Sequence, residues 1–484
     1  MKKFFAVIIL TVLAGFASVY AKPAGVPLDV VPEDVVCFGV IPNIETAIEL
    51  VSMMESSAGE EIGKFKPYIN LQSPLIFFLN DVENGFSFDE IDDKDLVLLI
   101  PVITAKKKEF IKYVEENLAN EKGKELKGGV IQFGDVYAAW LPGDYIAIAP
   151  VKENVEYIKK AKSVSKSKTD NAKNVTEFAG NVGASLAAVY LNGKIINDMM
   201  SSPESGGMMS QYKLDVRYAA SFLTGKIDLE NYQLGGDISL SSKLYLKDGK
   251  ALNQIFLMDD KTEKGVSYIP VKPLGLFELN VKPEILSLAS MFAMGMVGMD
   301  LSTMGWELIS GNLAVAVYPQ PGQEDFNDED MPQVLAFIST LKAKDSQVLM
   351  QNFLTLLQEA YPGSDMEEQT ISGTKVYLMV GLENTEDLYM APLSTGLLIG
   401  MGKDAVGKYI DSMKKKDVKT YNEVSMKDAK FYSVLNFYVK SDQIAKMLSE
   451  ETPMGGMIDL KKLFIQINIS KDSKVVEFKI SLNQ

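Results

Sequence analysis

The chain has 484 residues, of which 47% are hydrophobic and 23% are charged, so it can bury large cores and is too long for one average domain. Its formal net charge of −15 at pH 7 disfavours a nucleic-acid partner and an anionic membrane surface. With no histidine and one cysteine, the chain lacks the residues for Ser–His or Cys–His nucleophile pairs and for ordinary zinc sites. We therefore expect a protein that is not an enzyme, with no catalytic residue, no metal site and no cofactor.

Residues 1–21 have the pattern of a secretory signal peptide. Two lysines precede an apolar stretch, and the segment Val19–Ala21 forms a cleavage site. Cleavage after Ala21 predicts an exported protein, periplasmic or extracellular, without an integral membrane span in the mature chain. Cys37 follows in an apolar, strand-like run. As the single cysteine it forms no internal disulfide, and we expect it to be a small buried hydrophobic residue.

The first half of the chain recurs in the second half. The segment that begins at Val31 matches the segment that begins at Val271, and four further segments match in the same order, each about 240 residues further along. A period this long indicates a duplicated domain and not a solenoid. We expect a first repeat domain at 22–252, a linker at 253–269 and a second repeat domain at 270–484.

Both helical and strand periods occur within a repeat. The alternation Ile–Gln–Ile–Asn–Ile over residues 465–469 predicts one strand of a hairpin, with its isoleucines on the core and Gln466 in water. Phe110, Val114 and Leu118 have the spacing of one helix face. We therefore expect an α+β fold of two tandem homologous domains, each a mainly antiparallel sheet with helices packed on one face.

Two acidic segments occupy the same strand–strand loop of the two repeats, at Phe88–Asp95 and at Glu324–Asp330. Clustered carboxylates can hold calcium, but neither segment has the glycine and terminal glutamate of an EF-hand loop, so the pattern favours a solvated loop and a calcium site is the alternative. Among the 24 methionines, a dense group spans Met291–Met304. Thioethers suit Cu(I), but the apolar, helix-like surroundings favour methionines that fill the core or pack against a partner.

Methionine-rich loops recur at Met199–Met209 and Met447–Met457, each with a proline ahead of Gly-Gly-Met. Proline and glycine disfavour continuation of the preceding helix, and exposed methionines adapt to varied apolar partners. The loops are therefore candidate surfaces for an apolar ligand or an unidentified protein partner. The alternative is that they complete the core. The candidate binding residues are Met199, Met200, Met208, Met209, Met447, Met454 and Met457.

The chain also resembles a group of exported bacterial proteins of unknown function with duplicated α+β domains. The resemblance rests on Pro32-Glu33-Asp34 at the start of a strand and on the strand SGNLAVAVYP from Ser310, which is similar to a GELALAL.P motif. It implies a fold of two α+β domains and export from the cell. It names no site residues.

Three functions stay open on this basis. The sequence favours a non-enzymatic, soluble exported protein with a structural or binding role in the cell envelope. The first alternative is a carrier or chaperone-like module that binds apolar ligands or chains through the methionine-rich loops. The second is a hydrolase with an unrecognised carboxylate site, because the spacing of catalytic carboxylates is spatial and not sequential. A bare S-x-x-K pattern at Ser163–Lys166 lacks its companion motifs, which favours a loop over a catalytic serine.

Overall fold

The computed structural model describes residues 25–45, 48, 63–79, 96–119, 121–183, 185–201, 214–228, 233–250, 252–256, 265–270, 273–283, 305–323, 332–381, 387–414, 431–440 and 462–483. These residues form two compact units: unit 1 holds those up to Lys247 and those from Ser481 onward, and unit 2 holds those from Asp248 to Ile444 and from Leu460 to Ile480. Antiparallel strands with added helices make up the described residues, which is the α+β architecture expected from the sequence. The expected signal peptide at residues 1–21 lies outside the described residues.

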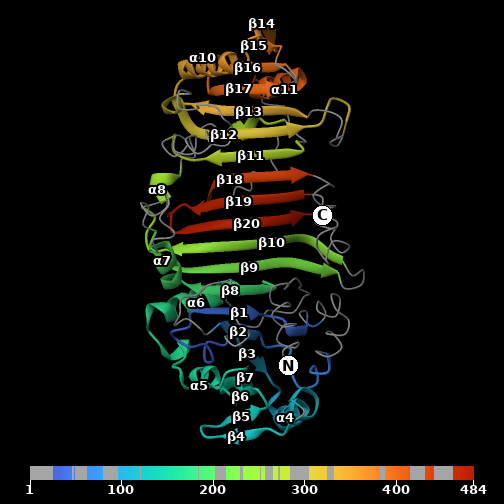
Figure 1. Ribbon diagram of the computed structural model, residues 1–484, viewed down its shortest axis with the longest axis vertical. Coiled ribbons are helices and arrows are strands. Elements are labelled where there is room, and N and C mark those ends of the chain that lie inside the picture. The colour runs from blue at the N-terminus through green and yellow to red at the C-terminus, as the bar shows by residue number, and fades with distance from the viewer. Residues whose placement is uncertain are drawn as a thin grey trace. The chain divides into compact units, whose positions relative to one another are not determined.

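The described strands of unit 1 pair antiparallel in the order β10-β9-β8-β1-β2-β3-β7-β6-β5-β4 (Figure 1). Every residue of β1 and of β3 is buried, so these central strands need cover on both sides of the sheet. The strands are β1 (Cys37–Ile41), β2 (Leu75–Leu79), β3 (Leu96–Pro101), β4 (Lys124–Leu126), β5 (Val130–Phe133), β6 (Val136–Trp140), β7 (Tyr145–Ala149), β8 (Ala187–Asn192), β9 (Val216–Asp228) and β10 (Gln233–Leu246).

Helices cover both faces of the unit 1 sheet. On one face, Phe110 of α4 joins Phe77 of β2 in a buried cluster, as the helical spacing around Phe110 predicts. The next residue, Phe78, points to the other face, where Phe38 of β1 lies between Phe78 and Phe178 of α6. The expectation of helices on one face is therefore wrong, because apolar side chains leave the central strands on both sides. The helices are α4 (Lys107–Tyr113), α5 (Lys152–Lys160), α6 (Asp170–Val182) and α7 (Gly193–Ser201), with shorter turns η3 (Thr104–Lys106), η4 (Val114–Ala119), η5 (Pro142–Asp144) and η6 (Val164–Lys166).

The described strands of unit 2 pair in the order β20-β19-β18-β11-β12-β13-β17-β16-β15-β14. This is the strand order of unit 1, with β11 in the place of β1 and each later strand in the place of its counterpart (Figure 1). The strands are β11 (Gly275–Asn280), β12 (Ile309–Tyr318), β13 (Gln333–Thr340), β14 (Asp365–Ile371), β15 (Thr374–Val380), β16 (Leu388–Pro392), β17 (Gly396–Met401), β18 (Phe431–Lys440), β19 (Lys462–Ser470) and β20 (Val475–Asn483).

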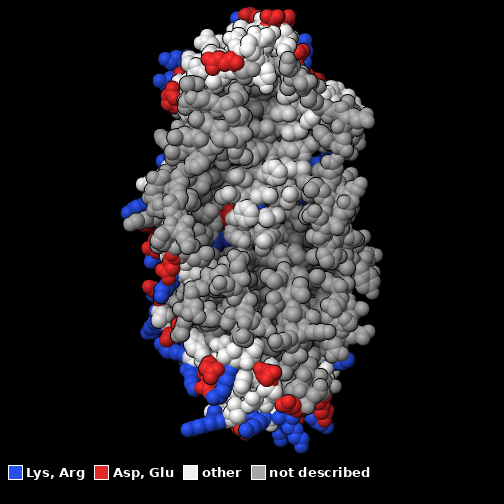
Figure 2. All heavy atoms as spheres, viewed as in Figure 1, with Lys and Arg blue, Asp and Glu red and all other residues white. Residues whose placement is uncertain are grey.

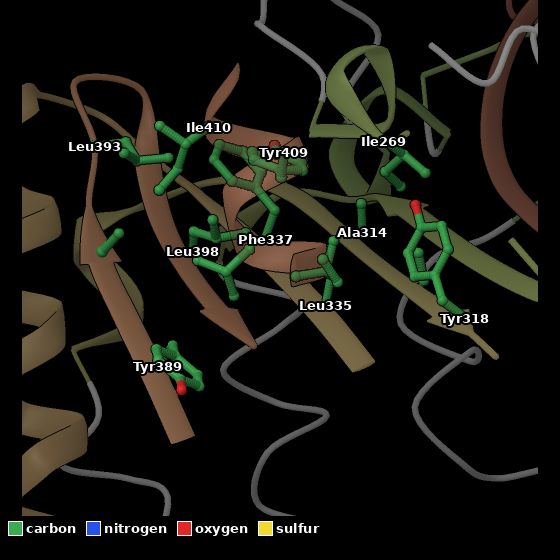
Figure 3. Close-up of a cluster of buried hydrophobic side chains, with 14 of the residues drawn as sticks. Ile269, Ala314, Tyr318, Leu335, Phe337, Tyr389, Leu393, Leu398, Tyr409 and Ile410 are labelled. Atoms are coloured by element: carbon green, nitrogen blue, oxygen red, sulfur yellow. The ribbon is translucent and has the colours of Figure 1, made fainter. Parts of the chain in front are cut away.

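One buried cluster organises the core of unit 2 (Figure 3). Tyr409 of α11 stacks on Phe337 of β13 with 5.7 Å between ring centroids, and Leu398 of β17 lies beside them. The same sheet face continues through Leu276 of β11 to Tyr438 of β18. The helices are α8 (Leu252–Ile255), α10 (Ala343–Ala360) and α11 (Lys403–Lys414), with shorter turns η9 (Gly265–Tyr268) and η11 (Trp306–Leu308).

The predicted C-terminal hairpin is present as β19 and β20, but its faces differ from the prediction. Gln466 is 6% exposed, whereas Ile465 and Ile467 are only partly buried. Gln466 can be buried because its amide donates a hydrogen bond to Asn436 at 3.0 Å. The segment predicted as a linker, 253–269, contains part of α8 and all of η9.

Several predicted features lie outside the described residues, and the predictions about them stand untested. These are the acidic segments Phe88–Asp95 and Glu324–Asp330, the group Met291–Met304, and Met208, Met209, Met447, Met454 and Met457. Met199 and Met200 belong to the last turn of α7, but their side chains are outside the described part. Among the helices that the structure describes, none combines the length and the apolar character needed to cross a bilayer.

Candidate functional site

A groove of about 680 Å³ lies in unit 1, where the first turn of α6 meets β8, β9 and the start of α7. This volume falls in the range of small-molecule sites, about 300–1,000 Å³. Figure 2 shows one face of the molecule, where the Lys and Arg side chains of the described residues are interspersed with Asp and Glu. The groove is lined by four asparagines (Asn171, Asn174, Asn192 and Asn197), four cationic residues (Lys173, Lys194, Arg217 and Lys247), Asp170, Asp198 and Val216.

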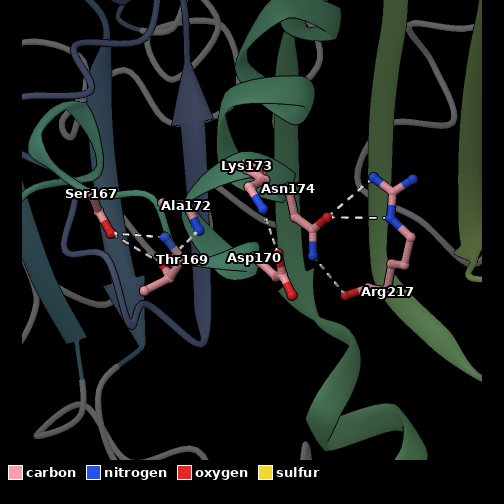
Figure 4. A network of polar contacts seen from close by, with 7 residues as sticks. All are labelled: Ser167, Thr169, Asp170, Ala172, Lys173, Asn174 and Arg217. Atoms are coloured by element: carbon pink, nitrogen blue, oxygen red, sulfur yellow. Dashed lines mark hydrogen bonds and ion pairs between the residues drawn. The ribbon is translucent and has the colours of Figure 1, made fainter.

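The first turn of α6 forms one wall of the groove, and a side-chain cap fixes where the helix begins. Thr169 precedes the helix with an extended backbone, and its hydroxyl oxygen accepts a hydrogen bond from the backbone N–H of Ala172 at 3.2 Å (Figure 4). The backbone N–H of Thr169 in turn donates to the hydroxyl of Ser167 at 3.2 Å. Threonine is a favoured N-cap because it satisfies one of the N–H groups that have no partner within the helix. The cap therefore sets the directions of Asn171 and Asn174.

Arg217, the only arginine of the chain, projects from β9 toward α6 (Figure 4). Its guanidinium donates to Oδ1 of Asn174, from Nε at 3.3 Å and from Nη2 at 3.1 Å, and Nη2 also bonds the carboxylate of Glu177. The amide nitrogen of Asn174 donates back to the carbonyl oxygen of Arg217 at 3.3 Å. The side chain of Arg217 remains 32% exposed. The guanidinium is therefore oriented by α6 and still open to the groove.

Two other asparagines hold the walls of the groove together. Asn171 accepts hydrogen bonds from the hydroxyl of Tyr190 at 2.6 Å and from the amide of Asn192 at 2.9 Å. Its own nitrogen donates to two carbonyl oxygens that precede β1. Asn197 of α7 bonds the backbone of Val216 in both directions, at 3.0 and 2.9 Å. These bonds fix α6 and α7 against the strands, so the groove is a formed feature and not a gap between loose elements.

Cationic side chains outnumber carboxylates in the groove lining. Lys173 pairs with Asp170 at 2.7 Å, and its hydrogen bond and charge hold the pKa of Asp170 below its usual range. Lys247 pairs with the aspartate that precedes β9 at 2.8 Å. Among the described residues, Lys194 and Asp198 form no ion pair. The lining thus holds four cations and two carboxylates, and two further carboxylates outside the lining pair with Arg217 and Lys247. Of the four cations, Lys194 is the one left without a paired carboxylate among the described residues, and Arg217 shares an exposed one.

A second polar centre is buried in the sheet of unit 2. Glu278 of β11 is 2% exposed, its cross-strand neighbour on β18 is Asn436, and the neighbour of Asn436 on β19 is Gln466. We call Glu278, Asn436 and Gln466 the polar row. Asn280 and Asn312 face each other across β11 and β12 one pair further along, and both are buried.

Amide groups surround the carboxylate of Glu278. Asn436 donates to Oε2 at 2.7 Å, and Asn280 and Asn312 each donate to Oε1 at 3.2 Å. Gln466 donates to Oδ1 of Asn436 at 3.0 Å, which holds the amide of Asn436 in place. No lysine or arginine of the described residues pairs with Glu278. A buried carboxylate is costly without such donors, so the row is a feature that the fold has to support.

The contacts of Cys37 and Ser163, two residues singled out in the sequence, are those of residues that stabilise the fold. Cys37 is buried in β1, and burial raises the pKa of its thiol to about 12, so it behaves as the expected small hydrophobic residue. In the S-x-x-K segment, the Ser163 hydroxyl lies 3.1 Å from that of Ser165, and the N–H of Val164 donates to the carbonyl of Val31 at 2.8 Å. These bonds close a loop against the residues before β1. In the described part of the chain, no three His, Cys, Asp or Glu side chains gather as a metal site would require.

No family model and no curated protein matches the chain. Two solved structures are similar in part, crystal forms III and IV of TP0453, at 12% and 11% identity. They cover 48% and 49% of this chain and 82% and 90% of their own, each with a TM-score of 0.27. A likeness at this score carries no argument about fold or function.

Neither the groove nor the polar row was predicted from the sequence. Two sequence signals mark them in retrospect. Arg217 is the only arginine among 49 cationic residues, so its position is distinctive. Glu278 and Asn280 occupy the buried positions of the alternating strand β11, where apolar residues are the rule.

Proposed function

We propose that the protein is a non-enzymatic, exported binding protein, and that the groove of unit 1 holds a small hydrophilic ligand with a negatively charged group. The observation that carries the proposal is the position of Arg217, whose guanidinium is oriented by Asn174 and open to the groove. A guanidinium suits carboxylate and phosphate groups because it is always charged and presents several N–H donors in one plane. A ligand anion would compete with Glu177, which is itself 41% exposed, for part of that charge.

The other cations of the groove support the same ligand class. Lys194 and Lys247 line the groove together with Arg217, and Lys194 forms no ion pair among the described residues. The bonds of Asn171 and Asn197 hold the groove walls before any ligand arrives. A preformed site loses less conformational freedom on binding, which favours affinity.

In this proposal the two units are tandem repeats of one domain. The ordered sequence matches and the shared strand order of the two sheets support the duplication. The pattern of residues 1–21 and the resemblance to exported bacterial proteins support export, to the periplasm or the exterior. Binding is assigned to unit 1 because Arg217 belongs to that unit.

Thermal unfolding with defined probes tests the proposal. The two tryptophans, Trp140 and Trp306, lie one in each unit, so a Trp306→Phe background reports unit 1 alone. We expect millimolar citrate or inorganic phosphate, at constant ionic strength, to raise the Tm of unit 1 saturably, because a ligand that binds only the folded state stabilises it. The neutral sugar trehalose at the same concentration should leave the Tm unchanged.

The variant Arg217→Gln removes the charge and should abolish the increment in Tm, even if it lowers the Tm of the free protein. Arg217→Lys should retain part of the increment. Lys112→Gln is the matched control, since Lys112 is an exposed cation of α4 outside the groove lining. An increment of equal size in the wild type and in Arg217→Gln would contradict the proposal.

A further inference from the structure

The positions of unit 1 that correspond to the polar row of unit 2 hold apolar residues. In the unit 1 sheet, Val40 of β1 has Ala188 of β8 as its cross-strand neighbour, and Ala188 has Phe222 of β9. All three are buried, with Val40 at 0%, Ala188 at 1% and Phe222 at 6% exposure. We call these residues the apolar row.

The two rows correspond by strand order and by spacing along the chain. β1, β8 and β9 have the same neighbours in unit 1 as β11, β18 and β19 have in unit 2. Val40 lies eight residues after Pro32, and Glu278 lies eight residues after Pro270. The β8 and β18 members of the rows each lie two residues before a buried tyrosine. The same three places therefore hold apolar side chains in unit 1 and a carboxylate with two amides in unit 2.

We propose that this difference prevents the strands of one unit from pairing within the sheet of the other during folding. The proposal rests on the duplication of the units. A strand of one unit can replace its counterpart in the other only if both sheets have the same strand order and register. Repeats joined in one chain are at high effective concentration, and misassembly between them is a characteristic failure of repeat proteins. The central strands β1 and β11 are the pair at risk.

Strand exchange is unfavourable when β11 takes the place of β1 in the sheet of unit 1. Glu278 would then take the place of Val40, between Ile76 of β2 and Ala188 of β8. Neither neighbour offers a hydrogen-bond donor from its side chain. The carboxylate would be buried without the amides of Asn436 and Asn312, since only Asn280 moves with it on β11. A buried charge that has lost its partners is strongly destabilising.

Exchange is unfavourable in the other direction as well. Val40 would take the place of Glu278, opposite Asn436 of β18. The amide of Asn436 would lose its acceptor at 2.7 Å, and Asn312 would lose both of its acceptors on β11, Glu278 and Asn280. Buried donors left without acceptors cost free energy, so each row rejects the strand of the other.

The single cysteine of the chain permits a direct test, because Cys37 lies on β1. In the native sheet Cys37 faces Leu191 of β8, and a β1 strand misplaced into unit 2 would set Cys37 in the place of Gly275, opposite Val439 of β18. Residues opposed across antiparallel strands are close enough for a disulfide. The full-length variant Val439→Cys therefore traps misplaced β1, and Leu191→Cys traps native β1.

Each variant is unfolded in reducing denaturant, refolded under oxidising conditions and analysed by peptide mapping for the disulfide. With the polar row intact, we expect the Leu191→Cys disulfide and almost none with Val439→Cys. The triple change Glu278→Val, Asn436→Ala and Gln466→Phe installs the apolar row in unit 2. It should raise the Val439→Cys disulfide by about tenfold or more, because the penalty on exchange is lost.

Glu278→Gln provides a second variant that keeps the volume and removes only the charge, and it should give an intermediate yield of the Val439→Cys disulfide. Natively folded Val439→Cys that is oxidised without unfolding is the control for a disulfide unrelated to misplacement. Equal yields of the misplaced disulfide with the polar row and with the installed apolar row would overturn the proposal. That outcome leaves the ligand proposal untouched, since the groove around Arg217 is not altered.

Discussion

The apolar row of unit 1 and the polar row of unit 2 occupy the same place in two sheets of the same strand order, and both are buried. In unit 1 the three side chains of the row are apolar, so burial alone is enough to accommodate them. In unit 2 the carboxylate of Glu278 is accommodated because three amide nitrogens lie within 2.7–3.2 Å of its oxygens. The comparison shows that a sheet position is not apolar by necessity. Burial of a charge is possible where neighbouring strands supply donors, and each supporting amide then becomes necessary.

The largest effect is expected for the reactivity of Cys37, which lies on β1, the strand that also carries Val40. Burial raises the pKa of Cys37 to about 12, so the thiolate that reacts with alkylating reagents is scarce in the folded state. We expect labelling at pH 8 to be slower than in the unfolded chain by a factor of about 10³ or more. Stopped labelling followed by mass spectrometry measures the rate. Reaction at the rate of the unfolded chain would show that β1 is not enclosed as described.

The next largest effect is expected on the free energy of unfolding of unit 1 when a charge is placed in the apolar row. Val40→Glu buries a carboxylate where no amide donors lie opposite, and we expect it to cost unit 1 about 3 kcal/mol or more at pH 7. Urea unfolding followed by Trp140 fluorescence, in the Trp306→Phe background, measures the loss. Val40→Gln is the matched control, because it adds similar volume without the charge. If the two variants lose the same stability, the charge is not what distinguishes the rows.

Removing one support of the polar row should have a smaller effect. Asn436→Leu deletes the 2.7 Å donor to Glu278, and we expect unit 2 to lose about 2 kcal/mol, as is typical of a hydrogen bond to a charged group. Trp306 fluorescence in a Trp140→Phe background reports this transition. Gln466→Leu, which removes a bond to an amide and not to the carboxylate, should cost less. The reverse order would mean that Asn436 does not support the carboxylate.

The smallest effect concerns an exposed carboxylate of unit 1. Hydrogen bonds from Lys107 and Thr104, together with the charge of Lys107, hold the pKa of Asp144 below its usual range. A lowered folded-state pKa stabilises the protein above the unfolded pKa, about 3.9, and the contribution disappears as the pH falls through the folded value. Asp144→Asn should therefore make unit 1 less dependent on pH below about 4, by a small amount because the group is exposed. Acid unfolding followed by Trp140 fluorescence is the measurement, and Asp135→Asn in an exposed turn is the control.

Much of the fold follows from the sequence, because alternation and helical spacing report burial directly. Phe110 and Val114 are buried as their spacing predicts, and the C-terminal hairpin forms. The prediction failed where hydrogen bonding replaced apolar contact. Gln466 was expected in water, yet its bond to Asn436 allows burial. The expectation of helices on one sheet face failed because β1 and β3 are buried along their whole length and need apolar cover on both faces.

The candidate sites were harder to predict than the fold. The groove brings together residues of α6, α7, β8 and β9, and the sequence does not show that Asn174 and Arg217 are neighbours. The same holds for Glu278 and Asn436, which are separated by 158 residues in the chain. The methionine-rich loops, by contrast, were conspicuous in the sequence. Their residues beyond α7 lie outside the described part, so the apolar binding surface stays a prediction.

The central claim, that the groove around Arg217 binds an anionic group, can be tested on a single resonance. Because Arg217 is the only arginine, the protein has one arginine Nε–Hε signal in a ¹⁵N correlation spectrum. Nε donates to Asn174 at 3.3 Å, so the signal reports the geometry of the groove itself. We expect titration with citrate or inorganic phosphate, at constant ionic strength, to shift this signal saturably, with no shift from trehalose. A signal that stays in place while either anion reaches saturating millimolar concentrations would contradict the account.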